Sequence, residues 1–340
     1  MKAKYNYNSK PFRWFVLYIS STPSEHNFFI NIIIPFLKKL NKNSIDNIEM
    51  DIICIGRKNN ATKLIENKII KIKSKYPYYK EKQILEDLSI EELMENLSNP
   101  YQGMMLASHS NGITIGLDKG IIIEVIELIK LCKKIVIKNR KFDYFVCDCC
   151  YMGSIESLYQ LSDITNYILA TPSYHDGKYS FIQCPEIYKY NDNKVIWISK
   201  FSNWYLSNSE HYANKLDYPI QWSIYDSEGI KELTNYLIKN NLTKELVFNN
   251  KSIIYHDDDN LHNFKKVIDT TIKKKPFLSK KLDKLLLLYF KTFVYYSYNQ
   301  PKNKPFIECP LSIHKELPSY LDKSLSCKMD YYDVVFCKKV

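Results

Sequence analysis

The sequence predicts an α/β protein in which helices flank a mostly parallel central sheet. Through the first half of the chain, short apolar runs of strand length alternate with segments whose apolar residues recur every three or four positions. The chain has 340 residues, enough for roughly two domain-sized units or for one large α/β domain with an extension. Its composition, 45% hydrophobic and 25% charged, is that of an ordinary globular protein and excludes wholesale disorder.

The strands of the first half are predicted from five apolar runs, of which the first, FRWFVLYIS, is typical of a buried strand. The runs cover residues 12–20, 50–55, 103–108, 144–149 and 166–171. Helical spacing predicts helices over residues 24–40, 89–97, 121–137 and 154–161. Because helices alternate with these strands, the strands are expected to run parallel.

Beyond residue 180 the alternation is less regular, and a domain boundary is predicted there. Residues 1–180 would form a core that carries the motifs described below, and residues 181–340 would complete the sheet and add helices. In this second part, strands are predicted over residues 194–199, 220–225, 311–313 and 332–336, and helices over residues 227–240 and 280–296. A serine or aspartate is expected to cap the helix over 227–240.

Charge and hydropathy narrow the classes of partner. The net charge is 48 − 37 = +11, but the basic residues are spread along the chain and no nucleic-acid-binding motif accompanies them. The basic run over residues 273–281 is expected to be a solvated loop. The longest apolar run, 285–290, is far shorter than the ~18–20 residues that span a bilayer, and residues 1–13 lack the apolar core of a signal peptide. We therefore expect a soluble, cytoplasmic protein that binds neither nucleic acid nor membrane.

The cysteines and acidic clusters do not predict a metal site. Nine cysteines are scattered without the dense spacing of a disulfide scaffold, which favours a reducing compartment. Cys147, Cys149 and Cys150 have no second C-x-x-C pair to complete a zinc site. The acidic residues 257–259 lack the spaced oxygen ligands of a calcium loop. No cofactor is therefore predicted, and a calcium requirement stays open.

Two predicted strand ends carry residues suited to catalysis. One strand runs into Ser108-His109-Ser110-Asn111-Gly112, and the next runs into Asp148-Cys149-Cys150-Tyr151-Met152-Gly153, with one predicted helix between them. If these strands are parallel neighbours, their ends lie about 4.8 Å apart at the edge where open α/β sheets bind ligands. His109 and Cys150, 41 residues apart (150 − 109), would then be neighbours, as a nucleophile and its acid/base partner are.

Strand alternation favours Cys150 over the other two cysteines of the motif. Asp148 and Cys150 share one side of an extended chain, whereas Cys147 and Cys149 take the other side and are expected to be small core residues. Cys150 also lies at the turn toward the next predicted helix, whose N-terminus would favour a thiolate. Five of the eight glycines lie around the two turns, at positions 103, 112, 116, 120 and 153.

These motifs resemble the clostripain-like cysteine peptidases, relatives of caspases, gingipains and legumains. The main similarity is a histidine turn after a strand, followed by Asp-x-Cys-x-Met-Gly-x-x-Glu from Asp148 to Glu156. Further similarities cover most of the chain: the strand over 12–20, the Leu161-Ser162-Asp163 and Tyr167-Ile168-Leu169-Ala170 segments, Gly177, the helix after 220–226, and Pro310-Leu311-Ser312-Ile313 before Pro318.

The resemblance implies a caspase-like three-layer α/β/α sandwich with a C-terminal extension. It also implies an endopeptidase that cleaves protein or peptide substrates after Arg or Lys through an acyl-enzyme, with Cys150 as nucleophile and His109 as acid/base. Backbone N–H groups of Ser110 and Cys150 would hold the oxyanion. Asp148 is the first candidate for the acidic pocket that receives the basic side chain, and Asp176 is the second.

The sequence departs from the family at one position and leaves two alternatives open. Ser110 follows the histidine where relatives usually have glycine, and a positive φ there would strain it. A catalytically impaired regulatory relative is therefore one alternative. The other is an α/β-hydrolase-type serine esterase that attacks with Ser110, although this alternative leaves the Asp-x-Cys-x-Met-Gly motif unexplained.

Two further expectations concern residues outside the motifs. Many relatives mature by self-cleavage between the two motifs, where Lys119, Lys138 and Arg140 lie. The other histidines are expected to be surface or turn residues, although one of them lies near the predicted pocket loop; they are His26, His175, His211, His256, His262 and His314.

Overall fold

A computed structural model gives the structure of the protein. It describes residues 12–20, 22–43, 48–57, 65–73, 78–84, 90–95, 97, 100–112, 114–118, 121–136, 140–173, 175, 181–188, 198–201, 203–204, 220–255, 258–299 and 309–315.

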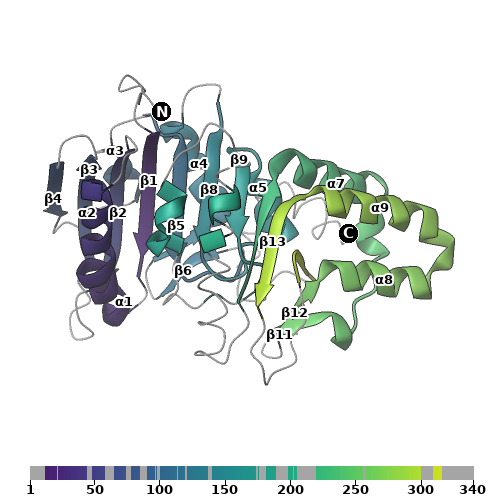
Figure 1. Ribbon diagram of the computed structural model, residues 1–340. Helices are drawn as coiled ribbons and strands as arrows, with labels where there is room; N and C mark the ends of the chain where they lie inside the picture. The colour runs from purple at the N-terminus through teal and green to yellow at the C-terminus, as the bar shows by residue number, and fades with distance from the viewer. Residues whose placement is uncertain are drawn as a thin grey trace, which may run out of the picture.

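A nine-stranded sheet forms the centre of the described chain, in the order β13-β10-β9-β8-β5-β1-β2-β3-β4 (Figure 1). The strands are β1 (Phe12–Ile19), β2 (Ile48–Arg57), β3 (Ile65–Lys73), β4 (Tyr78–Ile84), β5 (Gly103–Ser108), β8 (Phe142–Asp148), β9 (Thr165–Ala170), β10 (Ile220–Asp226) and β13 (Phe293–Asn299). The five middle strands, from β9 to β2, run parallel. The outer strands on both sides pair antiparallel with their neighbours, so the predicted mostly parallel sheet is confirmed.

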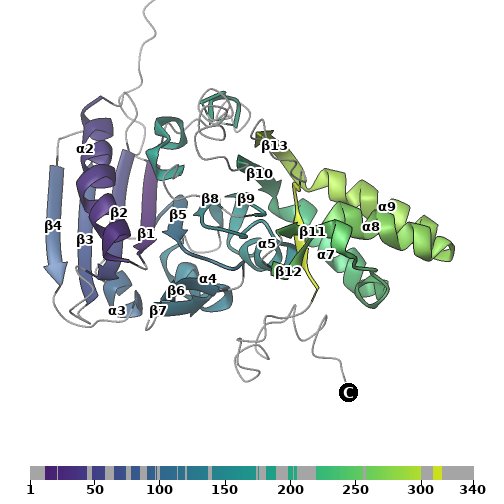
Figure 2. The same cartoon turned by 90° about the horizontal axis from the view of Figure 1, so that it is seen from below.

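Helices cover both faces of this sheet, as Figure 2 shows for α2 on one side and α3, α4 and α5 on the other. The first face carries α1 (Pro23–Phe28), a π-helical segment (Phe29–Ile33) and α2 (Ile34–Asn43). The second face carries α3 (Ile90–Glu95), α4 (Val125–Ile135), α5 (Ile155–Leu161) and α7 (Ser227–Lys239), while α9 (Ser279–Lys291) packs on α7, and α8 (Phe264–Lys274) packs on α9. The helices α7, α8 and α9 extend beyond β13 at one end of the sheet (Figure 1).

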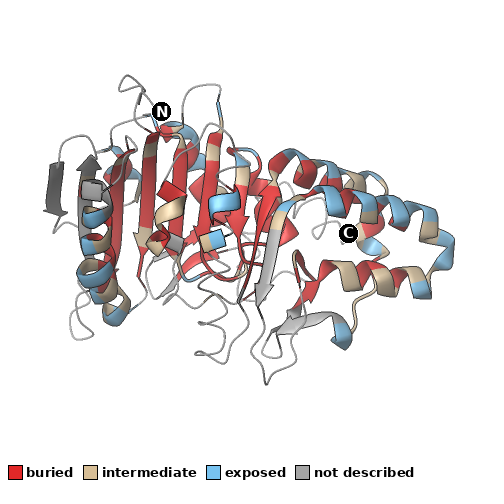
Figure 3. Ribbon diagram, in the orientation of Figure 1, coloured by how far each residue is buried: buried red, intermediate tan, exposed pale blue. Residues whose placement is uncertain are grey.

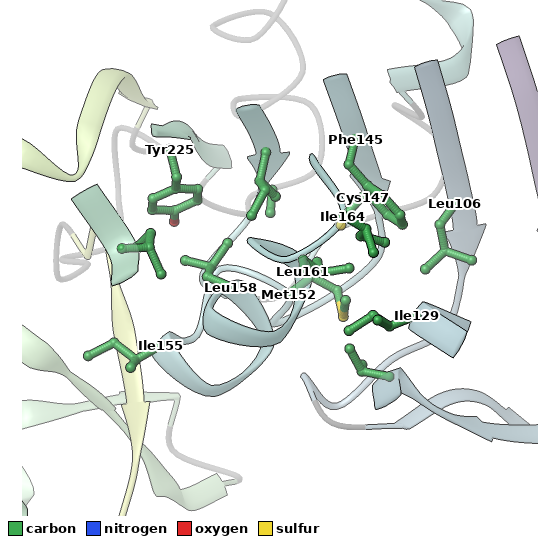
Figure 4. Close-up of a cluster of buried hydrophobic side chains, with 14 of the residues drawn as sticks. Leu106, Ile129, Phe145, Cys147, Met152, Ile155, Leu158, Leu161, Ile164 and Tyr225 are labelled. Carbon is green, nitrogen blue, oxygen red and sulfur yellow. The ribbon is translucent and has the colours of Figure 1, made fainter. Parts of the chain in front are cut away.

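Two buried clusters hold these layers together, one on each face of the sheet. Trp14 and Val16 of β1 pack with Phe29 and Leu37 on the first face. On the second face, Phe145 and Cys147 of β8 pack with Leu106, Ile129, Leu158 and Leu161 (Figure 4). The central strands β1, β2, β5, β8 and β9 are mostly buried, and helices such as α2, α7 and α9 are exposed on their outward sides (Figure 3). Strands buried on both faces explain why their sequences are continuous apolar runs.

Two small sheets complete the fold. β6 (Thr114–Asp118) and β7 (Ile121–Glu124) form a hairpin between β5 and α4. β11 (Ile253–Tyr255), β12 (Asp258–Asn263) and β14 (Ser312–His314) form a three-stranded sheet. Short 3-10 turns lie at Phe181–Gln183, Pro185–Tyr188, Leu242–Lys244, Asn250–Ser252 and Pro276–Leu278.

Several element predictions need correction. The helix predicted over 121–137 begins only at Val125, because residues 121–124 pair in the β6–β7 hairpin. The helix predicted over 280–296 ends at Lys291, and Phe293 begins the edge strand β13. A π-helical segment interrupts the helix predicted over 24–40. Of the strand predicted over 194–199, only residues 198 and 199 are described and they are helical, and the strand predicted over 332–336 lies outside the described residues.

The caps of the confirmed helices follow the sequence. Asp226 accepts a hydrogen bond from the backbone N–H of Gly229 and caps α7, as a serine or aspartate was expected to do. Ser154 caps α5 in the same way, accepting from Ser157 N–H. In the described part of the chain, every helix is too short or too polar to cross a bilayer.

Candidate active site

The pairing of β5 with β8 brings the two predicted motifs to one edge of the sheet. The strands are adjacent and parallel, and Ala107 is the partner of Asp148. His109 and Cys150 each lie two residues beyond this pair, so both follow the carboxyl ends of neighbouring strands. In Figure 1 the arrows of the parallel strands point to the lower edge of the sheet. The connection between the strands contains the β6–β7 hairpin as well as α4, whereas the sequence predicted a single helix.

The turns that follow these two strands touch each other. The Ser110 hydroxyl donates a hydrogen bond to the sulfur of Met152, at 3.2 Å. Gly112 has a φ of 90°, and a Cβ there would lie 2.8 Å from the carbonyl oxygen of Tyr151. Both the backbone conformation and the close approach therefore require glycine at position 112. These contacts fix the histidine turn against the cysteine turn.

Hydrogen bonds fix the Cys150 turn to the segment that follows β9. Tyr151 N–H donates to Ser173 O and Gly153 N–H donates to Thr171 O, each at 2.8 Å. Tyr151, directly after the cysteine, has a φ of 61°, a left-handed conformation that costs energy for a bulky residue. The packed turn around Cys150 therefore imposes a backbone conformation that Tyr151 would not adopt by itself.

The helix after Cys150 lies where it was predicted, over residues 154–161, but its N-terminus is too far from Cys150 to act on the thiol. α5 begins at Ile155, five residues beyond Cys150, and Ser154 is its cap. The field of a helix terminus falls off within one turn, so the expected support of a thiolate by this helix is not found.

Cys150 is nearly buried, with 6% of its surface exposed, and its sulfur contacts the backbone of His175. The His175 N–H donates to Sγ at 3.2 Å, and the thiol is 3.4 Å from the His175 carbonyl oxygen, to which it can donate. An N–H group directed at sulfur stabilises a thiolate. The predicted nucleophile thus has a donor in place.

The other two cysteines of the motif are core residues, as predicted. Cys147 and Cys149 belong to the cluster on the second face, whereas Val146 belongs to the cluster on the first. Burial raises the pKa of both thiols well above the usual value, so they stay neutral.

Asp148 pairs with a histidine that the sequence did not assign. His175 Nε2 lies 2.6 Å from Asp148 Oδ1, and the two side chains are 6% and 2% exposed. Ile182 N–H is 3.5 Å from the second carboxylate oxygen. His175 therefore contacts Cys150 through its backbone and Asp148 through its ring. Asp176, the second pocket candidate, lies outside the described residues.

His109 also has a carboxylate partner that the sequence did not assign. Its Nε2 lies 2.7 Å from Oε1 of Glu25, and the side chains are 45% and 35% exposed. The hydrogen bond with Glu25 raises the pKa of His109, and partial burial opposes this effect. A sequence signal existed, since Thr22 and Glu25 form the T-x-x-E capping box that begins α1.

Ser110 adopts a different conformation from the one expected. Among the described residues, a positive φ at a non-glycine residue occurs at Tyr151 and Asn241, so the strain expected at Ser110 is absent. Its hydroxyl contacts Met152 and accepts a hydrogen bond from Gly112 N–H, at 2.9 Å, and the residue is 3% exposed. This buried hydroxyl does not occupy the exposed elbow that an esterase nucleophile needs.

A third pair of this kind is fully buried behind the cysteine turn. His314 of β14 donates its backbone N–H to Glu156 Oε1, and its Nδ1 lies 3.1 Å from Oε2. His26, His262 and His314 are all buried, so the expectation of surface positions is wrong for them. His211 and His256 lie outside the described residues.

In the part of the chain that the structure describes, no set of side chains is suited to bind a metal ion. No group of three or more His, Cys, Asp or Glu side chains there is arranged to hold an ion.

Comparison with known proteins assigns the family. The model of the clostripain family matches residues 90–333, which is more than half of the chain. The chain belongs to the clostripain family. It is accordingly a cysteine-type peptidase that acts on protein or peptide substrates, as the resemblance implied. A comparison with curated proteins gave no match.

Solved structures of C11 proteases have the same fold as this chain at low sequence identity. A secreted C11 cysteine protease from Bacteroides thetaiotaomicron, in complex with an irreversible peptide inhibitor, gives a TM-score of 0.67 at 13% identity, with 96% of this chain and 100% of that chain covered. An inactive zymogen C11 protease from Parabacteroides distasonis gives 0.63 at 15% identity, with coverage of 96% and 99%. The predicted caspase-like fold is confirmed.

Proposed function

We propose that this clostripain-family protein is an endopeptidase that cleaves after Arg or Lys, with Cys150 as nucleophile and His109 as acid/base. One observation carries the proposal: the Ala107–Asp148 pairing brings both residues to the same edge of adjacent parallel strands, and their turns are in contact. A nucleophile and a proton carrier at one strand edge are what acyl transfer requires.

The reaction follows from these groups. The Cys150 thiolate attacks the scissile carbonyl carbon, and the protonated His109 gives its proton to the departing amine as the C–N bond breaks. The product of this half-reaction is a thioester at Cys150. His109, now neutral, takes a proton from water, which attacks the thioester and releases the acid, and the thiolate returns. Each half passes through an oxyanion that needs hydrogen-bond donors.

The backbone N–H groups of Ser110 and Cys150 are the proposed oxyanion donors. Two hydrogen bonds flank the Ser110–Ile115 bridge, from Asn111 N–H to Thr114 O and from Gly116 N–H to His109 O. Neither bond uses the N–H of Ser110. The ordinary backbone of Ser110 also removes the main reason to regard the protein as a catalytically impaired regulatory relative.

Asp148 is proposed as the carboxylate that binds the basic substrate side chain, with Asp176 as a second candidate. The carboxylate of Asp148 is buried two residues before Cys150, where a charged partner is bound most strongly. Because His175 occupies Oδ1, we propose that the entering guanidinium or ammonium group displaces this imidazole. Asp148 would then exchange the N–H donor of the His175 imidazole for the N–H donors of the substrate side chain.

The remaining expectations concern compartment, cofactors and maturation. We propose that the protein works in a reducing compartment such as the cytoplasm, supported by the scattered spacing of its nine cysteines, which is unlike that of a disulfide scaffold. We further propose catalysis without a metal, which unchanged rates in the presence of EDTA would support. Of the possible self-cleavage sites, Arg140 is exposed and lies two residues before β8, whereas Lys119 and Lys138 lie outside the described residues.

The test is hydrolysis of fluorogenic peptides that end in Arg, Lys, Asp or Asn. We expect the parent protein to cleave after Arg and Lys, and Cys150→Ala to cleave none of the peptides. Ser110→Ala should hydrolyse an ester as fast as the parent does, because Ser110 is not the proposed nucleophile. Asp148→Asn should lower kcat/KM for Arg peptides about 10- to 100-fold, the value of a lost charge-assisted hydrogen bond. Cleavage after Asp or Asn, or activity in Cys150→Ala, would contradict the proposal.

A further inference from the structure

His109 contacts Glu25 of α1, a helix near the start of the sequence, and the proposed reaction gives this contact no role. β1 pairs with β5 so that Ile19 is the partner of Ser108, and α1 begins four residues after Ile19. The start of α1 therefore lies beside the histidine turn, at the same edge of the sheet. From there Glu25 reaches His109 Nε2 at 2.7 Å, across 84 positions of sequence.

Hydrogen bonds other than the one to His109 also hold Glu25 in place. Its backbone N–H donates to Thr22 Oγ1, at 3.2 Å, and its Oε2 accepts from Thr22 N–H, at 3.3 Å. The hydroxyl of Tyr18 donates to the Glu25 carbonyl oxygen, at 3.0 Å. One carboxylate oxygen thus completes the helix cap, and the other is directed at the imidazole.

We propose that Glu25 is the positioning residue of the active site, whose carboxylate orients the His109 imidazole for proton exchange with Cys150. This inference rests on the proposed function. An acceptor at Nε2 selects the tautomer that carries its proton there, which leaves Nδ1 as the nitrogen that takes the thiol proton and returns it to the leaving amine. Without the carboxylate, the half-exposed ring could rotate and present either nitrogen.

The pKa of His109 supports the same assignment. The hydrogen bond with Glu25 is the main cause that raises it, so the imidazolium persists to higher pH than in an ordinary histidine. A neutral residue in place of Glu25 should therefore move the titration of His109 to lower pH.

Two variants separate positioning from a purely structural cap. Glutamine serves in a capping box as glutamate does, so Glu25→Gln keeps the cap and removes the charge. Thr22→Ala is the matched control, because it weakens the cap and keeps the carboxylate. A structural role predicts that Thr22→Ala is the more harmful of the two, and a positioning role predicts the reverse.

The experiment measures kcat and KM with an Arg peptide for Glu25→Gln, Glu25→Ala, Glu25→Asp and Thr22→Ala. We expect Glu25→Gln and Glu25→Ala to lower kcat about tenfold or more with little change in KM, Glu25→Asp to recover part of the loss, and Thr22→Ala to stay within about twofold of the parent. A kcat for Glu25→Gln within twofold of the parent, or an equal loss in Thr22→Ala, would overturn the proposal.

A second readout does not depend on activity. The His109 imidazole is titrated by NMR in Cys150→Ala, with and without Glu25→Gln, and the midpoint should fall when the charge is removed. An unchanged midpoint would overturn the role of Glu25. Inactivity of the unmodified protein with a lowered midpoint would instead refute the proposed peptidase activity and leave the pairing intact.

Discussion

Of the three imidazole–carboxylate pairs near the Cys150 turn, His109–Glu25 and His314–Glu156 differ mainly in exposure. His109 and Glu25 lie 2.7 Å apart with 45% and 35% of their side chains exposed. His314 and Glu156 lie 3.1 Å apart with 2% and 0% exposed. The accessible pair can exchange protons with a substrate, whereas the buried pair joins β14 to α5. Under the proposed function, the same two functional groups serve catalysis in one place and stabilise the fold in the other.

His109→Ala should have the largest effect on activity. Loss of the acid/base group is expected to lower kcat about 10²–10⁴-fold. The free energy of unfolding should change by no more than about 0.5 kcal/mol, because the side chain is half exposed. Peptide hydrolysis and urea unfolding of the same preparation check both values. A variant that unfolds, or one that keeps its kcat, would remove the distinction between the two pairs.

His314→Ala should show the opposite behaviour. It leaves the Glu156 carboxyl buried with one partner fewer, which is expected to lower the free energy of unfolding by about 3 kcal/mol. The kcat of the folded fraction should fall far less than in His109→Ala. Lys265→Ala is the control, since it breaks an exposed pair with Asp269 and should cost well under 1 kcal/mol. Equal stability of the two variants would contradict a structural role for His314.

His175→Ala should have the smallest effect, and it should depend on the substrate. The imidazole competes with the basic side chain for Asp148 Oδ1, so its removal is expected to raise kcat/KM for Arg peptides by about threefold. Peptides with a neutral residue at that position should be unaffected. The two peptide series, measured side by side, decide the matter: an equal loss for both would show that His175 only supports the fold.

The central sheet could be predicted because its parallel strands are buried on both faces. The sequences of such strands are continuous apolar runs, and one predicted run coincides with each of the strands β1, β5, β8 and β9. The same reasoning placed His109 and Cys150 at neighbouring strand ends, and the strand pairing agrees.

Elements at the edge of the fold were harder to predict. Residues 121–124 are isoleucines and a glutamate that fit a strand or a helix start equally well, and the decision comes from pairing with β6. At the end of α9, the carbonyl of Thr292 accepts a hydrogen bond from Asp226 N–H and the chain continues antiparallel to β10. Tertiary pairing, which a local pattern does not contain, set both boundaries.

The partners of the site residues could not be predicted from sequence spacing. Glu25 lies in a visible capping box, but its second contact is with a histidine 84 residues away. His175 follows β9 and was expected near the pocket, yet its bond to Asp148 depends on how the loop folds over the strand ends. Motifs indicate which groups do chemistry, and the fold decides which groups orient them.

The most direct test of the account is the site at which an irreversible peptide inhibitor with Arg at its reactive end attaches. Mass spectrometry of the labelled protein should find one adduct, on Cys150, formed much more slowly in His109→Ala and not formed with an inhibitor that ends in Asp. An adduct on any other of the nine cysteines, or equal labelling by the Asp inhibitor, would contradict the account.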